Sequence, residues 1–449
     1  MSRAFSLSGF PEWLPAQRVV EQAVLRAAGR IFALHGFASI ETRAVEPLSR
    51  LRGTSDAAKE VYALRRAEGD GGDLDLGLHF DLTVPFARYV TEHAGELAFP
   101  FRRYQIQKVW RGERPQEGRF REFTQADIDI VDRDQLAFHH DIEMAVVMSS
   151  VLAELPIPPA VIQVSNRKLA EGFYRGLGIT DVPQVLRIVD KLAKIGPDRV
   201  ADALVTQLSL SVAGAQACLA LAQIRTDDAT FVGSVRGLGV THELLDEGTA
   251  ELAAVVEGCN AARAGSAIAD LSIARGLDYY TGTVYETALI GHASVGSIAS
   301  GGRYDELARV GQTSYPGVGM SLGVTRLMSF ILSDGSVSAS RSVPSAVLVA
   351  VLDEESRARS SALAAQLRAR GIPCEVAPSA DKLGRQIRLA DRRGIPFVWF
   401  PGEAGESDSV KDIRSGDQVP ADAAHWSPPE ADRWPRVVTR RPEVEDTAP

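Results

Sequence analysis

The chain has 449 residues, 45% hydrophobic and 24% charged, which is the composition of an ordinary globular protein of about two to four domains. Its net charge of −9 argues against non-specific coating of nucleic acid, although local arginine clusters can still hold a nucleic-acid partner. Three cysteines without a CxxC pair argue against disulfides and thiolate zinc sites. The lack of a secretory-signal pattern, and of any apolar run near the ~18 residues of a membrane span, predicts a cytoplasmic protein with no membrane partner.

The first predicted element is a helix over residues 14–36, where apolar residues recur at spacings of three and four. Periodicity does not separate a helix that covers a sheet from one that forms a dimer interface. Residues 37–48 are predicted to form a strand. Further along, Asp81 and Thr83 stand just before Pro85, which favours the start of a helix there. On local sequence alone, these polar groups are best explained as helix caps.

The most informative stretch is 104–131, where two polar-rich strands flank a charged turn from Glu113 to Gly118. The period of two places a set of functional side chains on one face of the second strand: Arg119, Arg121, Phe123, Gln125, Asp127 and Asp129. An exposed sheet face would more often mix Lys, Glu and Thr. Arginines, an aromatic ring and carboxylates on one face instead predict a site that binds a polyanion and a cation together.

Residues 134–154 carry the apolar spacing of another helix. The following stretch, about 160–265, is rich in Ala and Leu, with helical patterns and no cluster of chemically suggestive groups. We interpret it as an inserted or appended helical module, whose function its residues do not reveal.

Chemistry resumes at residues 271–287, where Arg275 precedes Tyr279 and Tyr280. Arginine keeps its charge at all relevant pH values, so here it would act as a fixed cation beside two aromatic hydroxyls that suit a polar ligand. A buried arginine paired with a carboxylate such as Asp278 is the alternative.

Glycines at positions 317, 319 and 323 thin out a further predicted strand, so that a ligand or another backbone can come close. Arg326 follows at the start of a helix. Glycine spacing of this kind is weak by itself and gains weight from the other arginines.

A composition break over residues 331–345 predicts a linker between the preceding domain, 1–330, and a second one. Alternating strands and helices over 346–430 predict a small α/β domain. Residues 431–449, rich in Pro, Glu and Arg, are predicted to be a flexible tail.

Four stretches of the chain together resemble the histidyl-tRNA synthetase family of class II aminoacyl-tRNA synthetases. WRGERPQEGRFREFTQADIDI (110–130) is similar to the family's motif 2 hairpin, and ARGLDYYTGTVYE (274–286) to the stretch peculiar to histidine enzymes. GVGMSLGVTRL (317–327) resembles motif 3. KLGRQIRLADRRGIPFVWF (382–400), with KDIRSGDQ (411–418), resembles the C-terminal anticodon-binding domain.

The resemblance implies an α+β catalytic domain, with an antiparallel class II synthetase sheet, flanking helices and a helical insertion, followed by a small C-terminal α/β anticodon-binding domain. It also implies a homodimer with the 14–36 helix at its interface. The implied reaction is ATP-dependent activation of L-histidine to histidyl-adenylate and transfer to the 3′ end of tRNA(His). Mg²⁺ would arrive with ATP, and no metal site is expected in the chain itself.

The resemblance also implies roles for residues that match the family's motifs. Arg111 and Arg275 would hold the α-phosphate, and Arg326 would meet the γ-phosphate or cover the adenine; these three would be the catalytic residues. Glu113 and Phe123 would contact the adenine. A further set would bind histidine: Asp81, Leu82, Thr83, Gln125, Asp129, Tyr279 and Tyr280. In the hairpin turn, the candidates for reading the acceptor end of the tRNA are Gln116 and Arg121.

The sequence departs from the family pattern at three places. SGFPEWLP (8–15) stands where the family has a Gly-Thr-Arg-Asp-like opening, the nearest proline to motif 1 is Pro47, and Thr325 precedes Arg326 where the family has glutamate.

Three alternatives stay open. The first is the histidine-sensing regulatory subunit of ATP phosphoribosyltransferase, a paralogue without ligase activity that usually lacks the anticodon domain. The second is a duplicate synthetase tolerant of a histidine-like inhibitor, and the third is a non-enzymatic tRNA-binding protein.

Overall fold

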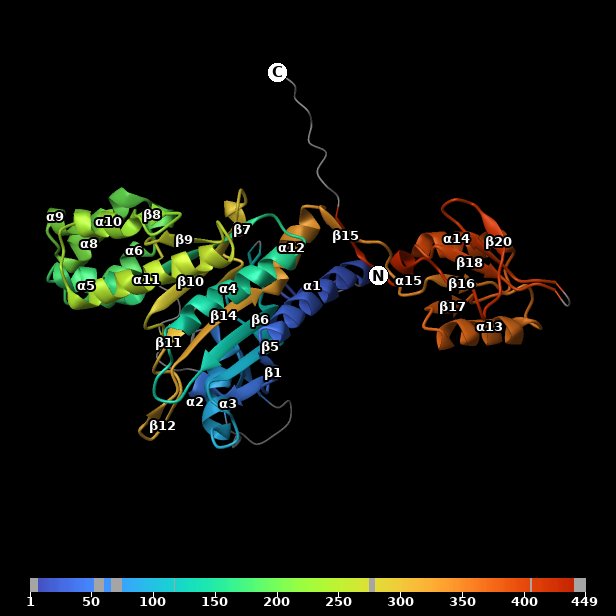
Figure 1. Cartoon of the computed structure of the whole chain (residues 1–449), viewed down its shortest axis with the longest axis horizontal. Helices are drawn as coiled ribbons and strands as arrows, with labels where there is room; N and C mark the ends of the chain where they lie inside the picture. The colour runs from blue at the N-terminus through green and yellow to red at the C-terminus, as the bar shows by residue number, and fades with distance from the viewer. Residues whose placement is uncertain are drawn as a thin grey trace, which may run out of the picture. The chain divides into compact units, whose positions relative to one another are not determined.

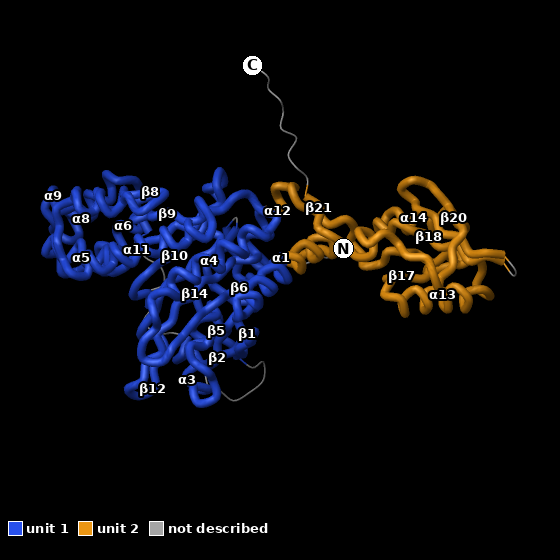
Figure 2. The backbone as a smooth tube through the Cα atoms, in the orientation of Figure 1, with its two compact units in different colours: residues 1–11, 24–330 blue, residues 12–23, 331–449 orange. Residues whose placement is uncertain are grey.

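The structure is a computed structural model that describes residues 7–51, 60–65, 75–116, 118–273, 279–403 and 406–439. The described residues form two compact units (Figure 2): one takes in those of 1–11 and 24–330, the other those of 12–23 and 331–449. Within this part of the chain, no helix combines the length and the apolar character of a membrane span.

The first unit is built on a nine-stranded sheet (Figure 1). Its six central strands are antiparallel neighbours, in the order β5 (Phe101–Trp110), β6 (Glu122–Val131), β14 (Gly317–Gly323), β11 (Ala299–Tyr304), β10 (Thr283–Leu289) and β7 (Ala160–Asn166). At the ends, β1 (Ala38–Ser39) is parallel to β5, β9 (Ala267–Asp270) is parallel to β7, and β8 (Arg225–Thr226) is antiparallel to β9. The predicted antiparallel sheet is confirmed for the centre, and the sheet as a whole is mixed.

Helices cover the apolar face of this sheet. The predicted N-terminal helix is α1 (Pro15–Leu34), whose Phe32 ring lies 5.7 Å from the ring of Tyr104 on β5. The second predicted helix is α4 (His139–Glu154), and α11 (Glu243–Ala262) packs beside it. Alternate residues of β6, such as Ile128 and Ile130, are fully buried under this layer. The opposite face of β6 is therefore the one left for chemistry, as the period of two predicts.

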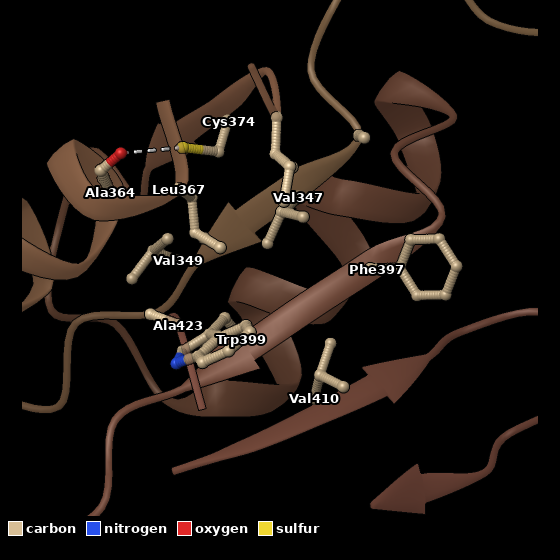
Figure 3. Close-up of a cluster of buried hydrophobic side chains, with 11 residues drawn as sticks. Val347, Val349, Ala364, Leu367, Cys374, Phe397, Trp399, Val410 and Ala423 are labelled. Atoms are coloured by element: carbon tan, nitrogen blue, oxygen red, sulfur yellow. Dashed lines mark hydrogen bonds between the residues drawn. The ribbon is translucent and has the colours of Figure 1, made fainter. Parts of the chain in front are cut away.

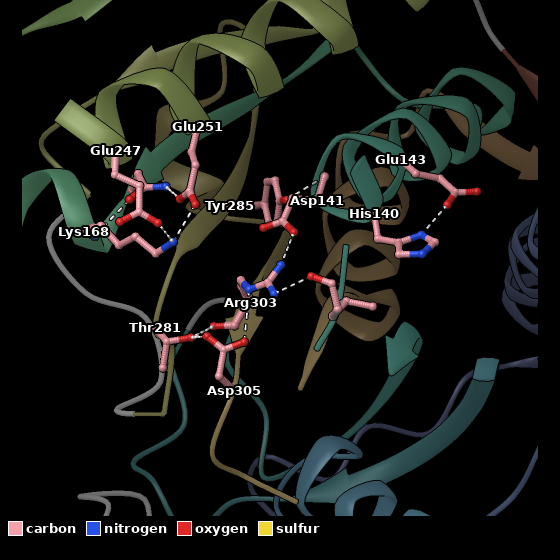
Figure 4. A network of polar contacts seen from close by, with 12 residues as sticks. His140, Asp141, Glu143, Lys168, Glu247, Glu251, Thr281, Tyr285, Arg303 and Asp305 are labelled. Carbon is pink, nitrogen blue, oxygen red and sulfur yellow. Dashed lines mark hydrogen bonds and ion pairs between the residues drawn. The ribbon is translucent and has the colours of Figure 1, made fainter. Parts of the chain in front are cut away.

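A polar network fastens the sheet to α4 (Figure 4). Arg303 of β11 donates to the Asp141 carboxylate at 2.8 Å and to the Leu136 carbonyl at 2.7 Å. Tyr285 of β10 donates to the Asp141 carbonyl at 2.7 Å. Burial raises the pKa of Asp141 to about 6, against the opposing effect of the Arg303 guanidinium. These bonds fix the strands that carry the site.

The predicted helical module is wrong at its start, because residues 160–166 form strand β7 in the middle of the large sheet. β7 contains three β-branched residues, Val161, Ile162 and Val164, which favour a strand, and it pairs with β10, which is far away in sequence. The helices that follow are α5 (Arg167–Gly176), α6 (Val182–Val189), α7 (Leu192–Ile195), α8 (Pro197–Leu208), α9 (Val212–Ala222) and α10 (Phe231–Gly237).

Two predicted elements are each split in the structure. Within the predicted helical module, one helical pattern in the sequence covers 198–222, but these residues form two helices, because Ser209 adopts a left-handed φ of 54° and Ser211 caps α9 by accepting from the Gly214 amide. The predicted strand 37–48 is β1 and β2 (Val45–Pro47). The latter belongs to a small sheet with β4 (Leu76–Leu78) and β3 (Ala63–Leu64).

The remaining elements of the first unit are short: α2 (Leu48–Leu51), α3 (Thr83–His93), the 3₁₀ helix η2 (Ala293–Val295), β12 (Arg309–Val310) and β13 (Thr313–Ser314). Helix α12 (Val324–Ser333) directly follows β14 and places Arg326 in its first turn, as predicted.

The second unit is an α/β fold with the predicted alternation of strands and helices. Its five-stranded sheet has the order β17 (Cys374–Val376), β16 (Val347–Val349), β18 (Phe397–Phe400), β19 (Ser409–Asp412) and β20 (Gln418–Pro420), with helices α13 (Arg357–Ala369) and α14 (Leu383–Arg393). Figure 3 shows the apolar cluster around Trp399, Val347 and Leu367.

The predicted linker and tail meet in the structure. β15 (Val337–Ala339), inside the predicted linker, pairs antiparallel with β21 (Val437–Thr439), inside the predicted tail, and α15 (Glu430–Arg433) precedes it. The prediction of a flexible segment from 431 is therefore wrong up to residue 439. Each strand has only three residues, so neither carries a pattern that local sequence reveals.

Candidate active site

The floor of the site is a pair of polar rows that run across the large sheet. Residues directly opposite one another on antiparallel strands share a face. One row consists of Arg103, Asp129, Gly319, Gly302 and Val284, and the next of Gln105, Asp127, Ser321, Ser300 and Glu286. The face is the one opposite α1 and α4. Strand register alone thus gathers side chains from five strands.

A first cavity, of about 190 Å³, opens above these rows. Four carboxylates line it, Asp81, Asp127, Asp129 and Glu286, and the three aspartates are buried. Desolvation raises the pKa of Asp127 to about 7 and that of Asp129 to about 6, even though the Arg103 guanidinium opposes both shifts. A cavity lined by buried carboxylates favours a small ligand with cationic or N–H donor groups.

Asp129 is held rigidly. The Arg103 guanidinium lies 2.5 Å from its Oδ2, and the Tyr304 hydroxyl donates to its Oδ1 at 2.8 Å. Arg103 is fully buried, lies over the Phe86 ring at 4.4 Å and donates to the Leu82 carbonyl at 3.3 Å. The Asp129 carboxylate therefore has a fixed position at the cavity wall.

Two glycines make the room that these side chains need. A Cβ on Gly319 would stand 2.1 Å from Asp129 Oδ1, and a Cβ on Gly302 would stand 2.8 Å from Cγ of Tyr280. Both distances are far below van der Waals contact, so only glycine fits at either position. The predicted role of glycine in admitting close approach holds for Gly319.

Asp81 serves two purposes at the start of α3. Its Oδ1 accepts from the Val84 amide at 3.1 Å, in the manner predicted for a cap, while its Oδ2 accepts from the Tyr279 hydroxyl at 3.4 Å. The carboxylate also lines the cavity together with Thr83. Leu82 is fully buried and does not line it.

A second cavity, of about 100 Å³, adjoins the first. It is lined by the hairpin residues Glu113 and Phe123 and by Arg119 and Arg326. Arg326 donates from Nε to the Gly118 carbonyl at 2.9 Å, and from Nη1 to the Ser297 carbonyl. Burial, together with the charges of Arg119 and Arg111, lowers the pKa of Arg326. This cavity suits an anion.

Arg111 lines both cavities. Its Nε donates to the Phe80 carbonyl at 3.0 Å, and its guanidinium lies 5.0 Å from the centre of the Phe123 ring. It is therefore a fixed cation at the junction of an acidic cavity and an arginine-lined one.

The other predicted residues fall in different places. Tyr280 lines the first cavity, whereas Tyr279 contacts Asp81 and packs edge-on against Tyr280 at 5.1 Å. The predicted tRNA contacts line neither cavity: Gln116 is exposed at the turn, and Arg121 donates from Nε to the Glu113 carbonyl at 3.2 Å. Arg275 lies outside the described residues.

Sequence reasoning assigned no role to several residues that build the site: Arg103, Asp127, Glu286, Ser300, Tyr304 and Ser321. Asp127 was placed on the correct face by the period of two, which was the available signal. Arg103 stands one residue before the hairpin stretch, and the same period would have added it. In the described part of the chain, no three His, Cys, Asp or Glu side chains are grouped so that they could hold a metal ion.

Comparison with known proteins gives one consistent family. The sequence model described as histidyl-tRNA synthetase matches residues 9–327, and one described as anticodon binding domain matches residues 346–423. The chain is 59% identical to the histidine–tRNA ligase of Cutibacterium acnes and 59% identical to that of Micrococcus luteus, over 98% of this chain and 99% of the relative in each case.

Solved structures agree. The histidyl-tRNA synthetase of Nostoc sp. PCC 7120 matches with a TM-score of 0.82 and 34% identity, over 94% of this chain and 98% of that one. An ATP phosphoribosyltransferase regulatory subunit/histidyl-tRNA synthetase from Bacillus halodurans C matches with a TM-score of 0.70 and 20% identity, over 86% and 96%. The second likeness shows the fold alone.

Proposed function

Because the chain belongs to the histidyl-tRNA synthetase family, we propose that its two adjoining cavities are one active site, in which histidine meets ATP. The chain is a class II histidine–tRNA ligase, which charges tRNA(His) with histidine. The site assignment rests on the position of Arg111, which lines both the cavity that contains the carboxylates and the cavity that contains the other arginines.

The regulatory-subunit alternative has less support. The anticodon-binding model matches residues 346–423, and the relatives that align over nearly the whole chain are histidine–tRNA ligases.

The proposed reaction has two steps. An oxygen of the histidine carboxylate attacks the α-phosphorus of ATP, the bond from that phosphorus to the β-phosphate bridge breaks, and pyrophosphate leaves. A hydroxyl of the 3′-terminal ribose of tRNA then attacks the carbonyl carbon of the adenylate, and AMP leaves. Negative charge grows on the α-phosphate oxygens in the first step, so a fixed cation at the junction lowers the barrier. Arg111 lies at this junction, and Arg275 would share the task.

The first cavity would bind histidine by its two basic ends. Asp81, Thr83 and Gln125 would accept from the amino group, and Asp129 with Tyr280 would read the imidazole. Support comes from the burial of Asp129, whose position is set by Arg103 and Tyr304. A pocket with fixed partners for the ring nitrogens rejects amino acids that lack them, because its own polar groups would be left unpaired. Leu82 would contribute only through its backbone, and Tyr279 through Asp81.

The second cavity would take the nucleotide. Glu113 would accept from the adenine amino group, and Phe123 would stack on the base. Arg326 would either cover the other face of the base or meet the γ-phosphate. ATP is the substrate used by this enzyme class, and we propose that it enters with Mg²⁺ bound to its phosphates. The anionic preference of a cavity lined by Arg111, Arg119 and Arg326 supports this assignment.

We propose that residues 1–330 act as the catalytic domain and 346–430 as the anticodon-binding domain, with Gln116 and Arg121 near the acceptor end of tRNA(His). We also propose that the protein is a cytoplasmic homodimer with α1 at its interface. Sedimentation equilibrium tests the dimer: a mass of one chain at micromolar concentration would contradict it.

The test of the function is histidine-dependent exchange of pyrophosphate into ATP, with each of the twenty amino acids tried separately and no tRNA present. We expect exchange with histidine alone, followed by charging when tRNA(His) is added. Binding of histidine without exchange would overturn the ligase assignment and favour the regulatory alternative.

A further inference from the structure

A chain of hydrogen bonds links three strand side chains at the floor of the first cavity. The Ser321 hydroxyl donates to Asp127 Oδ1, and the Gln125 amide nitrogen donates to Ser321 Oγ at 2.7 Å. Gln125 and Asp127 are neighbours on the same face of β6, and Ser321 stands opposite Asp127 on β14. All three side chains line the cavity.

The direction of this chain follows from the chemistry of its members. Above its pKa of about 7 the Asp127 carboxylate is ionised and only accepts, so at pH 8 the single O–H of Ser321 is donated to Asp127. Ser321 Oγ can then only accept from Gln125, and Gln125 must present its NH₂ group to Ser321. The amide oxygen of Gln125 is thereby turned away from Ser321. It is buried and has no hydrogen-bond partner among the residues that the structure describes.

We propose that Asp127 and Ser321 are positioning residues that lock the Gln125 amide with its oxygen facing the cavity, where it accepts from the amino group of the substrate. Without the lock, the amide of a glutamine can turn over and present N–H groups to that same amino group. The assignment rests on the proposed binding of histidine in this cavity. Asp127 acts through the other two residues, and its role requires an acceptor oxygen rather than a charge.

The experiment measures pyrophosphate exchange by full-length protein, and compares KM for histidine with KM for ATP. Ser321→Ala and Asp127→Ala should each raise KM for histidine about tenfold, the effect of losing one oriented hydrogen bond. The double variant should also raise KM for histidine about tenfold, because both changes break the same chain of hydrogen bonds. Asp127→Asn should stay within about threefold of wild type, since its amide oxygen still accepts from Ser321. KM for ATP should change less than about twofold throughout.

Ser165→Ala is the matched control, because it removes another buried serine hydroxyl of the same sheet that lines neither cavity. It should leave both KM values unchanged.

Three results would overturn the proposal. A double variant whose KM for histidine rises about a hundredfold would mean that the two residues contribute independently. An Asp127→Asn variant as impaired as Asp127→Ala would mean that the charge itself is recognised, and a Ser321→Ala variant with normal KM would mean that the hydroxyl has no role. If Asp127→Ala fails to fold, Ser321→Ala and Asp127→Asn decide between the same outcomes. If the wild-type protein shows no pyrophosphate exchange with histidine, the proposed function itself is contradicted.

Discussion

The two large sheets of the molecule differ in what their strands bury. In the five-stranded sheet of the second unit, both faces are apolar: Val347 and Trp399 belong to one buried cluster, and Leu348 and Val398 to another. In the nine-stranded sheet, one face is apolar under α1 and α4. The other face carries the two polar rows, which include the buried carboxylates of Asp127 and Asp129, and the buried carboxylate of Asp81 lies beside them.

This difference between the two sheets indicates that the five-stranded sheet contributes mainly to stability, whereas the polar face of the nine-stranded sheet contributes to binding and catalysis. Burying a carboxylate costs free energy unless it is paired, whereas burying a tryptophan or valine stabilises the fold outright. The polar rows are therefore tolerated for what they bind. The apolar sheet, by contrast, should act through stability alone in any step that does not involve tRNA.

The sharpest way to test this contrast is Arg111→Ala, at the junction of the two cavities. Loss of the fixed cation should lower the rate of pyrophosphate exchange about a thousandfold, because charge on the α-phosphate in the transition state loses its partner. The free energy of unfolding should change little, since among the described residues the side chain makes one hydrogen bond, to the Phe80 carbonyl, and lies over the Phe123 ring. Exchange kinetics and urea unfolding measure the two effects.

Arg111→Lys is the control for this variant. It keeps the charge but loses the planar fork of donors, so its rate should fall between those of wild type and Arg111→Ala. A rate within tenfold of wild type for Arg111→Ala would remove Arg111 from the catalytic step.

Trp399→Ala tests the apolar sheet. Trp399 is fully buried, so the change should lower the stability of the second unit by about 4 kcal/mol through the lost contacts and the cavity left behind. Exchange without tRNA should stay within about twofold of wild type. Calorimetry and exchange at 20 °C measure this, with Val419→Ala, half-exposed on β20, as the neutral control. A parallel fall in exchange would break the contrast between the sheets.

Local patterns predicted much of this architecture. Helices α1 and α4 follow from apolar spacing, and the hairpin of β5 and β6 follows from alternation around a turn. The same alternation placed Gln125 and Asp129 on the functional face, because the side-chain period of a strand is fixed by its backbone. The resemblance to a family supplied the roles that spacing could not.

What local patterns missed is set by contacts distant in sequence. The pairing of β14 with β6 brings Ser321 beside Asp127, and neither stretch of sequence alone predicts this pairing. The pairing of β15 with β21 is similar: each strand is three residues long, and each is ordered by the other. The sequence around Arg103 does not distinguish it from a surface arginine. Its role follows only from the strand pairing that places Asp129 opposite it.

Asp129→Asn tests the recognition of histidine in the polar row. It should raise KM for histidine about a hundredfold while KM for ATP changes less than about threefold, because a neutral amide replaces the carboxylate that reads the ring. Asparagine is chosen because it keeps an acceptor oxygen in front of the buried Arg103 guanidinium. Alanine would remove the ion pair and leave Arg103 with neutral oxygens such as the Leu82 carbonyl, which would confound binding with misfolding. Equal losses for histidine and ATP would mean that Asp129 does not read the ring.

The smallest expected effect is on stability, in Asp127→Asn. Burial raises the pKa of Asp127 to about 7 in the folded protein, so the folded state holds a proton that the unfolded state has lost. That preference stabilises the wild type fully below about pH 4, and the stabilisation disappears as pH rises through 7. Asparagine never ionises. The variant should therefore match wild type near pH 4 and exceed its free energy of unfolding by about 2 kcal/mol at pH 5.5, since each pH unit between the two pKa values costs the wild type about 1.4 kcal/mol; urea unfolding measures the difference. Asp417→Asn, which changes an exposed aspartate, is the control variant. A difference from wild type that is the same at both pH values would mean that the buried charge of Asp127 carries no cost.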